Sequence, residues 1–239
     1  MRIDALCRQL RRIVRAGIAI GLAWLVFALV KPAPQDLPWM PLRLDAPIGL
    51  FTGRKLAALT HRPAECRMLL RDTGIAFRQV PPHGSGRCLA ADTVRIAAGQ
   101  QMLSLSPASV APSCPVAAGL LVWQWQVVQP AAQRLFGASV ARIDHYGSYS
   151  CRRMYGHESR SWSEHAIDVS GFVLTDGTRV SVARDWSAED RKGRFLHTVR
   201  DGACRLFSTV LSPDYNAAHR DHFHLDQAAR GEWGGRACR

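Results

Sequence analysis

The longest apolar stretch of the chain lies near the N-terminus and has no polar face. It covers residues 16–30, AGIAIGLAWLVFALV, and follows four arginines between positions 8 and 15. A basic segment before an uninterrupted apolar run is typical of a signal anchor. Residues 16–30 alone reach roughly 22 Å of a bilayer core of about 30 Å, so we extend the span to Ile13 and Val14. No Ala-x-Ala-like cleavage site follows. We therefore expect a single-pass helix over residues 13–30 in the cytoplasmic (inner) membrane, with the N-terminus inside and the main domain in the periplasm.

Beyond the anchor, apolar spacing predicts helices first and strands afterwards. A helical period appears in the first half, and alternation around the turn dipeptide Asp176-Gly177 indicates a hairpin in the second. The expected helices are residues 62–71, 116–128 and 189–207, and the expected strands are residues 140–144, 167–174, 179–183 and 222–226. This order favours an α+β fold, with a small antiparallel sheet packed against helices.

Changes in composition divide the chain into four parts. Five prolines in residues 31–48 predict an extended tether. The expected parts are a cytoplasmic tail and anchor (residues 1–31), a proline-rich tether (32–48), a small annex (49–105) and the main domain (106–239).

Composition limits the classes of protein. With 47% hydrophobic residues in 239, the chain can bury a sizeable core, which excludes a purely disordered protein. The formal net charge of +12 predicts a surface that attracts anions, such as nucleic acid, anionic lipid or an acidic wall polymer. Solubility together with the basic flank of the anchor explains the charge equally well.

Six cysteines lie after the anchor, an even number that suits an oxidising compartment. They are Cys66, Cys88, Cys114, Cys151, Cys204 and Cys238. Sequential pairing, 66 with 88, 114 with 151 and 204 with 238, would tie three local units and predicts a disulfide-stapled fold. The chain has no CxxC pair, which argues against a cysteine-rich zinc site.

Histidines gather near the C-terminus. His219, His222 and His224 lie within six residues, and on a strand His222 and His224 share one face while Phe223 and Leu225 pack inward. Paired imidazoles suit a hydrolytic metal site, to which His165 and Asp168 from the hairpin could add ligands. A pH-sensitive or hydrogen-bonded histidine cluster is the alternative.

A series of ordered motifs points to one family. They are Cys114-Pro115, VQPAA at 128–132, GSYSCR at 147–152, SEHA at 163–166, IDVSGF at 167–172, SPDYN at 212–216 and HFHLD at 222–226. Through them the chain, from about Cys66 to its end, resembles the extensin-like C-terminal domain family of bacteria. That family is similar to D-Ala-D-Ala carboxypeptidases and murein endopeptidases, which are small zinc enzymes.

The resemblance implies a Zn²⁺ ion held by His165, Asp168 and His224. His222 would be the base or transition-state stabiliser, with His219 and Asp221 beside it. Only two residues separate His165 from Asp168, fewer than the family pattern has. Positions three apart on a strand face opposite sides, so zinc binding needs either a turn at Ala166 or His157 as a substitute for His165.

Residues before the hairpin are candidates for substrate binding. Arg152 could hold a peptide carboxylate through its two-pronged guanidinium, and Ser148 and Tyr149 could line the cleft. We therefore expect a zinc-dependent peptidase or amidase acting on peptidoglycan peptides in the periplasm. A catalytically degenerate, membrane-anchored module that binds peptidoglycan or another anionic envelope polymer is the alternative. We do not expect a nucleic-acid partner, because export removes it and no recognition motif is present.

Overall fold

The structure is a computed structural model that describes residues 2–30, 33–86, 89–97, 99, 102–148, 165–228 and 235–239. Its longer helices are α1 (Arg2–Val30), α2 (Thr52–Ala58), α3 (Pro63–Asp72), α4 (Cys114–Trp123), α5 (Gln129–Phe136), α6 (Val182–Asp185) and α7 (Arg191–Cys204). Short 3₁₀ turns lie at Pro34–Asp36, Leu59–His61 and Ala217–His219, and a π-helical turn, Gln124–Val128, joins α4 to α5. The predicted helices at residues 62–71, 116–128 and 189–207 correspond to α3, to α4 with its π turn, and to α7.

The strands form one large sheet and one small one. The small sheet pairs β1 (Phe77–Gln79) with β2 (Val94–Ile96). The main sheet has seven strands in the order β3-β4-β5-β8-β7-β9, with β6 also paired to β5. Its strands are β3 (Ser104–Ser106), β4 (Val140–His145), β5 (Ala166–Leu174), β6 (Arg179–Ser181), β7 (Thr209–Leu211), β8 (Phe223–Asp226) and β9 (Ala237–Cys238).

The α+β class is confirmed, but the sheet is mixed and not purely antiparallel. The predicted hairpin is the β5–β6 pair, and β4, β5, β8 and β7 are antiparallel neighbours. At the two edges, however, β3 lies parallel to β4 and β9 lies parallel to β7. These edge strands have three and two residues, too short for an alternating pattern to show in the sequence.

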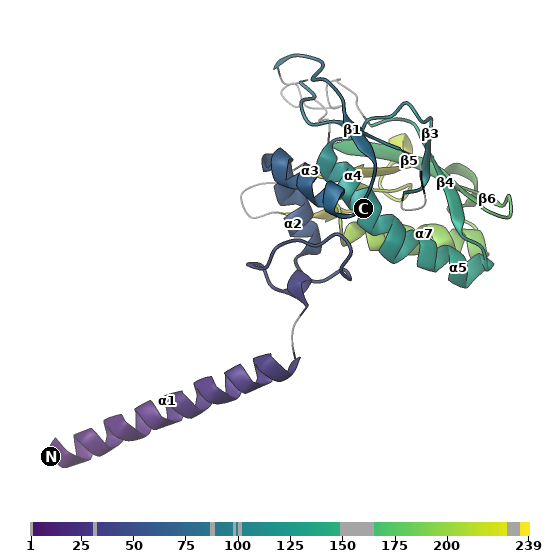
Figure 1. Ribbon diagram of the computed structural model, residues 1–239. Coiled ribbons are helices and arrows are strands. Elements are labelled where there is room, and N and C mark those ends of the chain that lie inside the picture. Colours follow the sequence, from purple (N-terminus) through teal and green to yellow (C-terminus); the bar gives the residue numbers. More distant parts are fainter. Residues whose placement is uncertain are drawn as a thin grey trace.

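The core lies between the sheet and the helices α4, α5 and α7 (Figure 1). Trp123 of α4 and Phe195 of α7 both pack against Phe172 of β5, with ring centroids 5.8 Å and 5.1 Å away. Leu42 and Leu44, from the predicted tether, belong to the same core. Residues of the predicted tether, annex and main domain therefore share one apolar core. The division of the chain into four parts stays a prediction.

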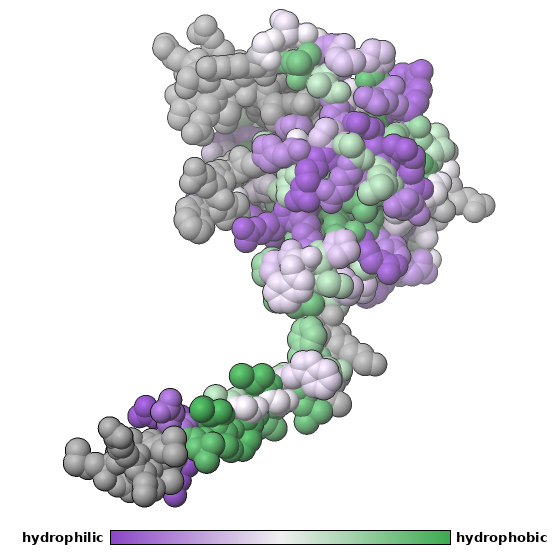
Figure 2. Space-filling model, turned by 60° about the vertical axis from the view of Figure 1, so that its left-hand side comes forward, coloured by the Kyte–Doolittle hydropathy of each residue, from purple (hydrophilic) through white to green (hydrophobic). Residues whose placement is uncertain are grey.

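The N-terminal helix α1 extends away from the folded body (Figure 1). Apolar residues are exposed along its second half, including Trp24 with 70% of its surface accessible (Figure 2). Over the described residues, no helix combines the length and the apolar character needed to cross a membrane. The predicted single-pass anchor at residues 13–30, and with it the inner-membrane localisation, is therefore wrong. The arginines up to Arg15 occupy the first half of the helix, which leaves an apolar stretch shorter than a bilayer core.

Two disulfides are present in the described part of the chain. Cys204 pairs with Cys238, as predicted, and so joins the end of α7 to β9. Cys66 pairs with Cys114, so the predicted bonds from Cys66 to Cys88 and from Cys114 to Cys151 are wrong. Sequential pairing failed because α3 and α4 lie side by side although 48 residues separate the two cysteines. Cys88 and Cys151 lie outside the described residues.

Candidate functional site

The candidate site begins with one residue pair at the centre of the main sheet. Asp168 on β5 is directly opposite His224 on β8. Opposed residues on antiparallel strands share a face, and His224 Nδ1 lies 2.8 Å from Asp168 Oδ1. The alternate positions Val169 and Phe223 are fully buried on the opposite face. The sheet therefore fixes this carboxylate and this imidazole against each other.

His222 adds a second imidazole to the same carboxylate. Its Nε2 is 3.7 Å from Asp168 Oδ1, and its Nδ1 is 2.9 Å from Asp221 Oδ1. An ionised carboxylate only accepts hydrogen bonds, so His222 Nδ1–H donates to Asp221. In the neutral ring, Nε2 is then unprotonated and faces the site.

His219 approaches from the 3₁₀ turn before β8, and Asn216 sets its tautomer. Asn216 Oδ1 accepts from the backbone N–H of Ala218 at 3.0 Å and lies 2.7 Å from His219 Nδ1. Because that oxygen is an acceptor, Nδ1 of His219 carries the proton and Nε2 does not. The ring centroid of His219 lies 5.2 Å from that of His222 and 6.0 Å from that of His224. Asp168, His219, His222 and His224 together are called the histidine cluster below.

Electrostatics set the charge state of the histidine cluster. Burial alone would raise the pKa of Asp168, but the hydrogen bond from His224 and the charges of the histidines lower it below the usual value. Burial, followed by the fields of His222 and His224, lowers the pKa of His219 to about 4. At neutral pH the cluster therefore contains an ionised carboxylate and a neutral His219.

His165 lies apart from the histidine cluster. Its Nδ1 is 3.0 Å from Ser113 Oγ, and it occupies the turn immediately before β5, which begins at Ala166. Burial and the nearby charge of His61 lower the pKa of His165 to about 4. The structure thus brings together Asp168, His224, His222, His219 and Asp221, but not His165.

The described residues do not fit the three-ligand zinc site that the resemblance implies. In that part of the chain, no group of three or more histidine, cysteine, aspartate or glutamate side chains could hold a metal ion. Two of the three implied ligands, Asp168 and His224, are in direct hydrogen-bond contact. The substitute ligand His157 and the substrate candidates Tyr149 and Arg152 lie outside the described residues.

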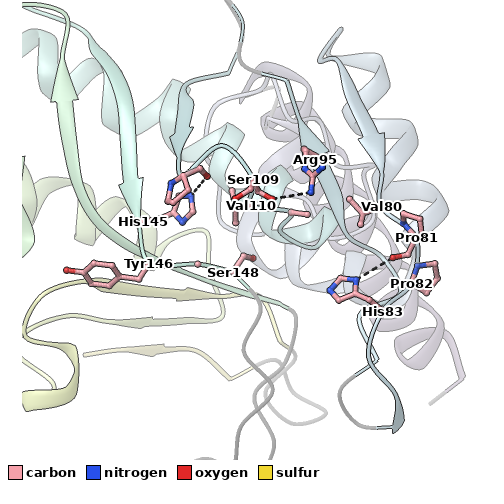
Figure 3. Close-up of a pocket in the computed structure, with 13 residues that line it drawn as sticks. Val80, Pro81, Pro82, His83, Arg95, Ser109, Val110, His145, Tyr146 and Ser148 are labelled. Carbon is pink, nitrogen blue, oxygen red and sulfur yellow. Dashed lines mark hydrogen bonds between the residues drawn. The ribbon is translucent and has the colours of Figure 1, made fainter.

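A pocket of about 580 Å³ lies at the end of β4, where His145 and Tyr146 line it (Figure 3). Ser148, a predicted substrate residue, lines it, although its hydroxyl donates to the carbonyl of Ala166 at 2.7 Å. Tyr146 lines it as well, and its ring packs edge-on against His222 with centroids 5.7 Å apart. The backbone N–H of Tyr146 also donates to the carbonyl of Asp168 at 2.8 Å, and the N–H of Asp168 donates to the carbonyl of Gly147, another lining residue, at 3.0 Å. The pocket wall is thus attached to the histidine cluster through Tyr146 and Gly147.

Sequence reasoning missed two residues of this site. Asn216 orients His219, and its position three residues earlier, at the start of a short turn, is the typical place for a capping side chain. Tyr146 follows the last residue of β4, where nothing in the local pattern marks it as the neighbour of His222. Only Asn216 could have been found from the sequence, through its capping position.

The fold and the site together describe an α+β domain in which histidines gather at the start of one strand of the main sheet. The chain belongs to the family described as Extensin-like protein C-terminus, which matches residues 64–239. This confirms the family expected from the ordered motifs. No curated protein and no solved structure matches the chain.

Proposed function

We propose that the chain is a hydrolase that cleaves amide bonds in peptides of the peptidoglycan type, with the histidine cluster as its active site. The proposal rests on one observation: two neighbouring histidines each have their tautomer fixed by a hydrogen bond to a side-chain oxygen. His222 and His219 each direct Nδ1–H at a side-chain oxygen and leave Nε2 unprotonated, and Nε2 of His222 lies 3.7 Å from the Asp168 carboxylate. The likeness of the motifs to peptidoglycan-cutting zinc peptidases supports this choice of substrate.

The chemistry of the proposed reaction follows from the hydrogen bonds. His222 Nε2 takes a proton from a water molecule as the water oxygen bonds to the amide carbon. The carboxylate of Asp221 holds the other ring nitrogen and stabilises the imidazolium, and Asp168 adds a second negative charge. His222 then returns the proton to the leaving nitrogen as the carbon–nitrogen bond breaks. The products are a carboxylate and an amine.

The resemblance of the motifs to zinc peptidases implies a zinc ion, which would act as a Lewis acid on the amide carbonyl. The described residues supply Asp168 and His224 but no third ligand, so no step above depends on the ion. A metal-bound form requires a further donor from outside them, for which His157 is the proposed candidate. Metal analysis of the purified full chain after equilibration with zinc tests this part separately.

The test of the proposal is cleavage of defined peptidoglycan fragments by the full chain. The fragments are incubated with and without added zinc, and the products are separated by liquid chromatography and identified by mass. We expect new amine and carboxylate ends with the parent protein and their loss with His222→Ala. Intact fragments under both conditions would refute the proposal.

A non-catalytic binding module is the second candidate, and the position of His165 favours it. The histidine cluster is formed, but His165, one of the implied ligands, is hydrogen-bonded to Ser113. In that case, sedimentation with purified peptidoglycan persists in the His222→Ala, His224→Ala double variant, and no cleavage accompanies it. The net charge of +12 implies that added salt weakens such binding.

A further inference from the structure

One loop carries Asn216, the hydrogen-bond partner of His219. Residues 212–218, called the Asn216 loop below, lie between β7 and His219 and are mostly exposed. At the start of the loop, Ser212 donates its backbone N–H and its hydroxyl to a backbone carbonyl just after β9, both at 2.8 Å. Between Ser212 and the buried His219, Asp214 is the loop residue that, within the described part of the chain, has a hydrogen bond to the rest of the protein. The exposed part of the loop is therefore attached through Asp214.

Trp186 holds Asp214 through its indole nitrogen. The Nε1–H of Trp186 donates to Asp214 Oδ1 at 2.8 Å. Trp186 lies at the end of α6 and is 7% exposed, and its ring meets that of Phe223 of β8 at 75° with centroids 5.6 Å apart. The ring of His197 of α7 lies 4.0 Å from it, centroid to centroid. Packing against β8 and α7 therefore fixes the donor, and the hydrogen bond ties the Asn216 loop to the strand that carries His224.

Arg200 of α7 contacts the same two residues. Its Cζ lies 5.4 Å from the ring centroid of Trp186, and its Nη1 lies 3.9 Å from Asp214 Oδ2. The side chain of Asp214 is 55% exposed, so water screens this ion pair and it contributes little. The hydrogen bond from the buried indole is directional, and it is therefore the contact that restricts Asp214.

We propose that Asp214 and Trp186 are positioning residues, which hold His219 in one tautomer by keeping Asn216 in place. Asn216 follows Asp214 by two residues, and its Oδ1 lies 2.7 Å from His219 Nδ1. When Asp214 is released, Asn216 can move out of this reach, and the neutral ring of His219 can then carry its proton on Nε2. The importance of this tautomer for catalysis rests on the proposed function, but the tautomer itself does not.

Nuclear magnetic resonance of the full chain with ¹⁵N-labelled histidine tests the proposal at pH 7, because long-range ¹H–¹⁵N correlations distinguish the two neutral tautomers. The signals of His219 are assigned by their loss in His219→Ala. In the parent protein the proton should lie on Nδ1. Trp186→Phe removes the donor and keeps an aromatic ring, and Asp214→Ala removes the acceptor. In both variants the ratio of the Nδ1–H to the Nε2–H tautomer should fall about tenfold, the usual net value of one hydrogen bond.

Two further variants are matched controls. Asp214→Asn keeps Oδ1 as an acceptor and should keep the tautomer ratio of the parent protein. Asp201 also contacts Arg200, with its Oδ1 2.8 Å from Nε, but it lies on α7, so Asp201→Ala should keep the ratio as well.

Three results overturn the proposal. They are a proton on Nε2 of His219 in the parent protein, an unchanged ratio in a folded Trp186→Phe or Asp214→Ala variant, and an equal shift in Asp214→Asn or Asp201→Ala. If circular dichroism shows that Trp186→Phe does not fold, the comparison of Asp214→Ala with Asp214→Asn decides, because this side chain is exposed.

The cleavage assay separates this inference from the proposed function. If both hold, kcat falls about tenfold in Trp186→Phe and in Asp214→Ala, with KM unchanged, because the catalytic groups and not the substrate contacts are displaced. If the tautomer shifts as expected but the parent protein cleaves nothing, the proposed function fails and the positioning stands. If the parent protein cleaves the fragments and both variants keep its tautomer and its kcat, the positioning fails and the function stands.

Discussion

At the scale of single residues, hydrogen bonds to side-chain oxygens decide what each histidine can do. Asp221 and Asn216 fix the tautomers of His222 and His219, and His224 contacts Asp168 directly. His165 has the same side chain but is bonded to Ser113 Oγ. Proximity in the sequence therefore does not predict a shared role among these histidines.

The first prediction compares His224→Ala with His165→Ala in the cleavage assay. Removing His224 takes away the partner of Asp168 within the histidine cluster, so the rate should fall by about 100-fold or more. Removing His165 leaves the cluster intact, and the rate per folded molecule should stay near that of the parent protein. A large loss in His165→Ala, at a temperature where circular dichroism shows a folded chain, would place His165 in the active site.

The second prediction concerns Asp221→Ala. Without the carboxylate, the Nδ1 proton of His222 loses its acceptor, so the ring can take the wrong tautomer and its cation loses a stabilising charge. We expect kcat to fall by about 10- to 100-fold and the melting temperature to change little. Asp201→Ala is the control because Asp201 is an exposed carboxylate on α7. Equal rates in the two variants would contradict the proposed role of Asp221.

At the scale of elements, side chains that bond to backbone groups hold helices and strands in place. The amide of Gln129, at the start of α5, donates to the carbonyl of Val140 and accepts from its N–H, both at 2.9 Å. Trp123 of α4 donates its indole N–H to the carbonyl of Val199 in α7 at 2.8 Å. These bonds set α4, α5 and α7 against the sheet that carries the histidine cluster.

The third prediction concerns the start of α7 and its dependence on pH. Asp190 accepts from the backbone N–H groups of Gly193 and Lys192, and these bonds lower its pKa. Because the pKa is lower in the folded state, the stabilisation is present above the unfolded value of about 3.9 and is lost as the pH falls through the folded value.

Two variants separate the capping role from the charge. Asp190→Asn can still cap the helix but does not titrate, so its melting temperature should fall less between pH 5 and pH 3 than that of the parent protein. Asp190→Ala should melt at a lower temperature than either at neutral pH. Parallel melting curves for Asp190→Asn and the parent protein across this range would contradict the assignment.

At the scale of the whole molecule, the disulfides join segments that are distant in sequence. The bond between Cys66 and Cys114 ties α3 to the start of α4, and the bond between Cys204 and Cys238 ties α7 to β9. The core that they border extends from Leu42 to Leu225. The described body is therefore stabilised as one unit.

The fourth prediction follows from that connectivity. Peptide mapping without reduction should recover a linked fragment containing Cys66 and Cys114, and none linking Cys66 to Cys88. The Cys66→Ala, Cys114→Ala double variant should lose about 2–5 kcal/mol of unfolding free energy in a denaturant titration, because the 48-residue separation makes the closed loop long. A double variant as stable as the parent protein would mean that this bond contributes little.

The sequence alone determined the family and several of the longer elements. The α3 helix, the β5–β6 hairpin and the β8 strand follow from local apolar periods and the Asp176-Gly177 turn. The ordered motifs predicted the family from about Cys66 to the end, and the family match over residues 64–239 confirms it. The inward positions of Phe223 and Leu225 follow from the same alternation. Each of these features depends on neighbours within a few residues, so the sequence is sufficient to predict it.

The tertiary structure alone decided the contacts between distant segments. Cys66 meets Cys114 because two helices pack together, and Arg95 and His145 line one pocket because β2 and β4 come from different parts of the chain. His165 bonds to Ser113, 52 residues earlier in the chain, because the turn before β5 lies beside the residue that precedes α4. Such contacts depend on how helices pack and how strands pair, and the pattern of apolar and polar residues within a few positions does not predict either.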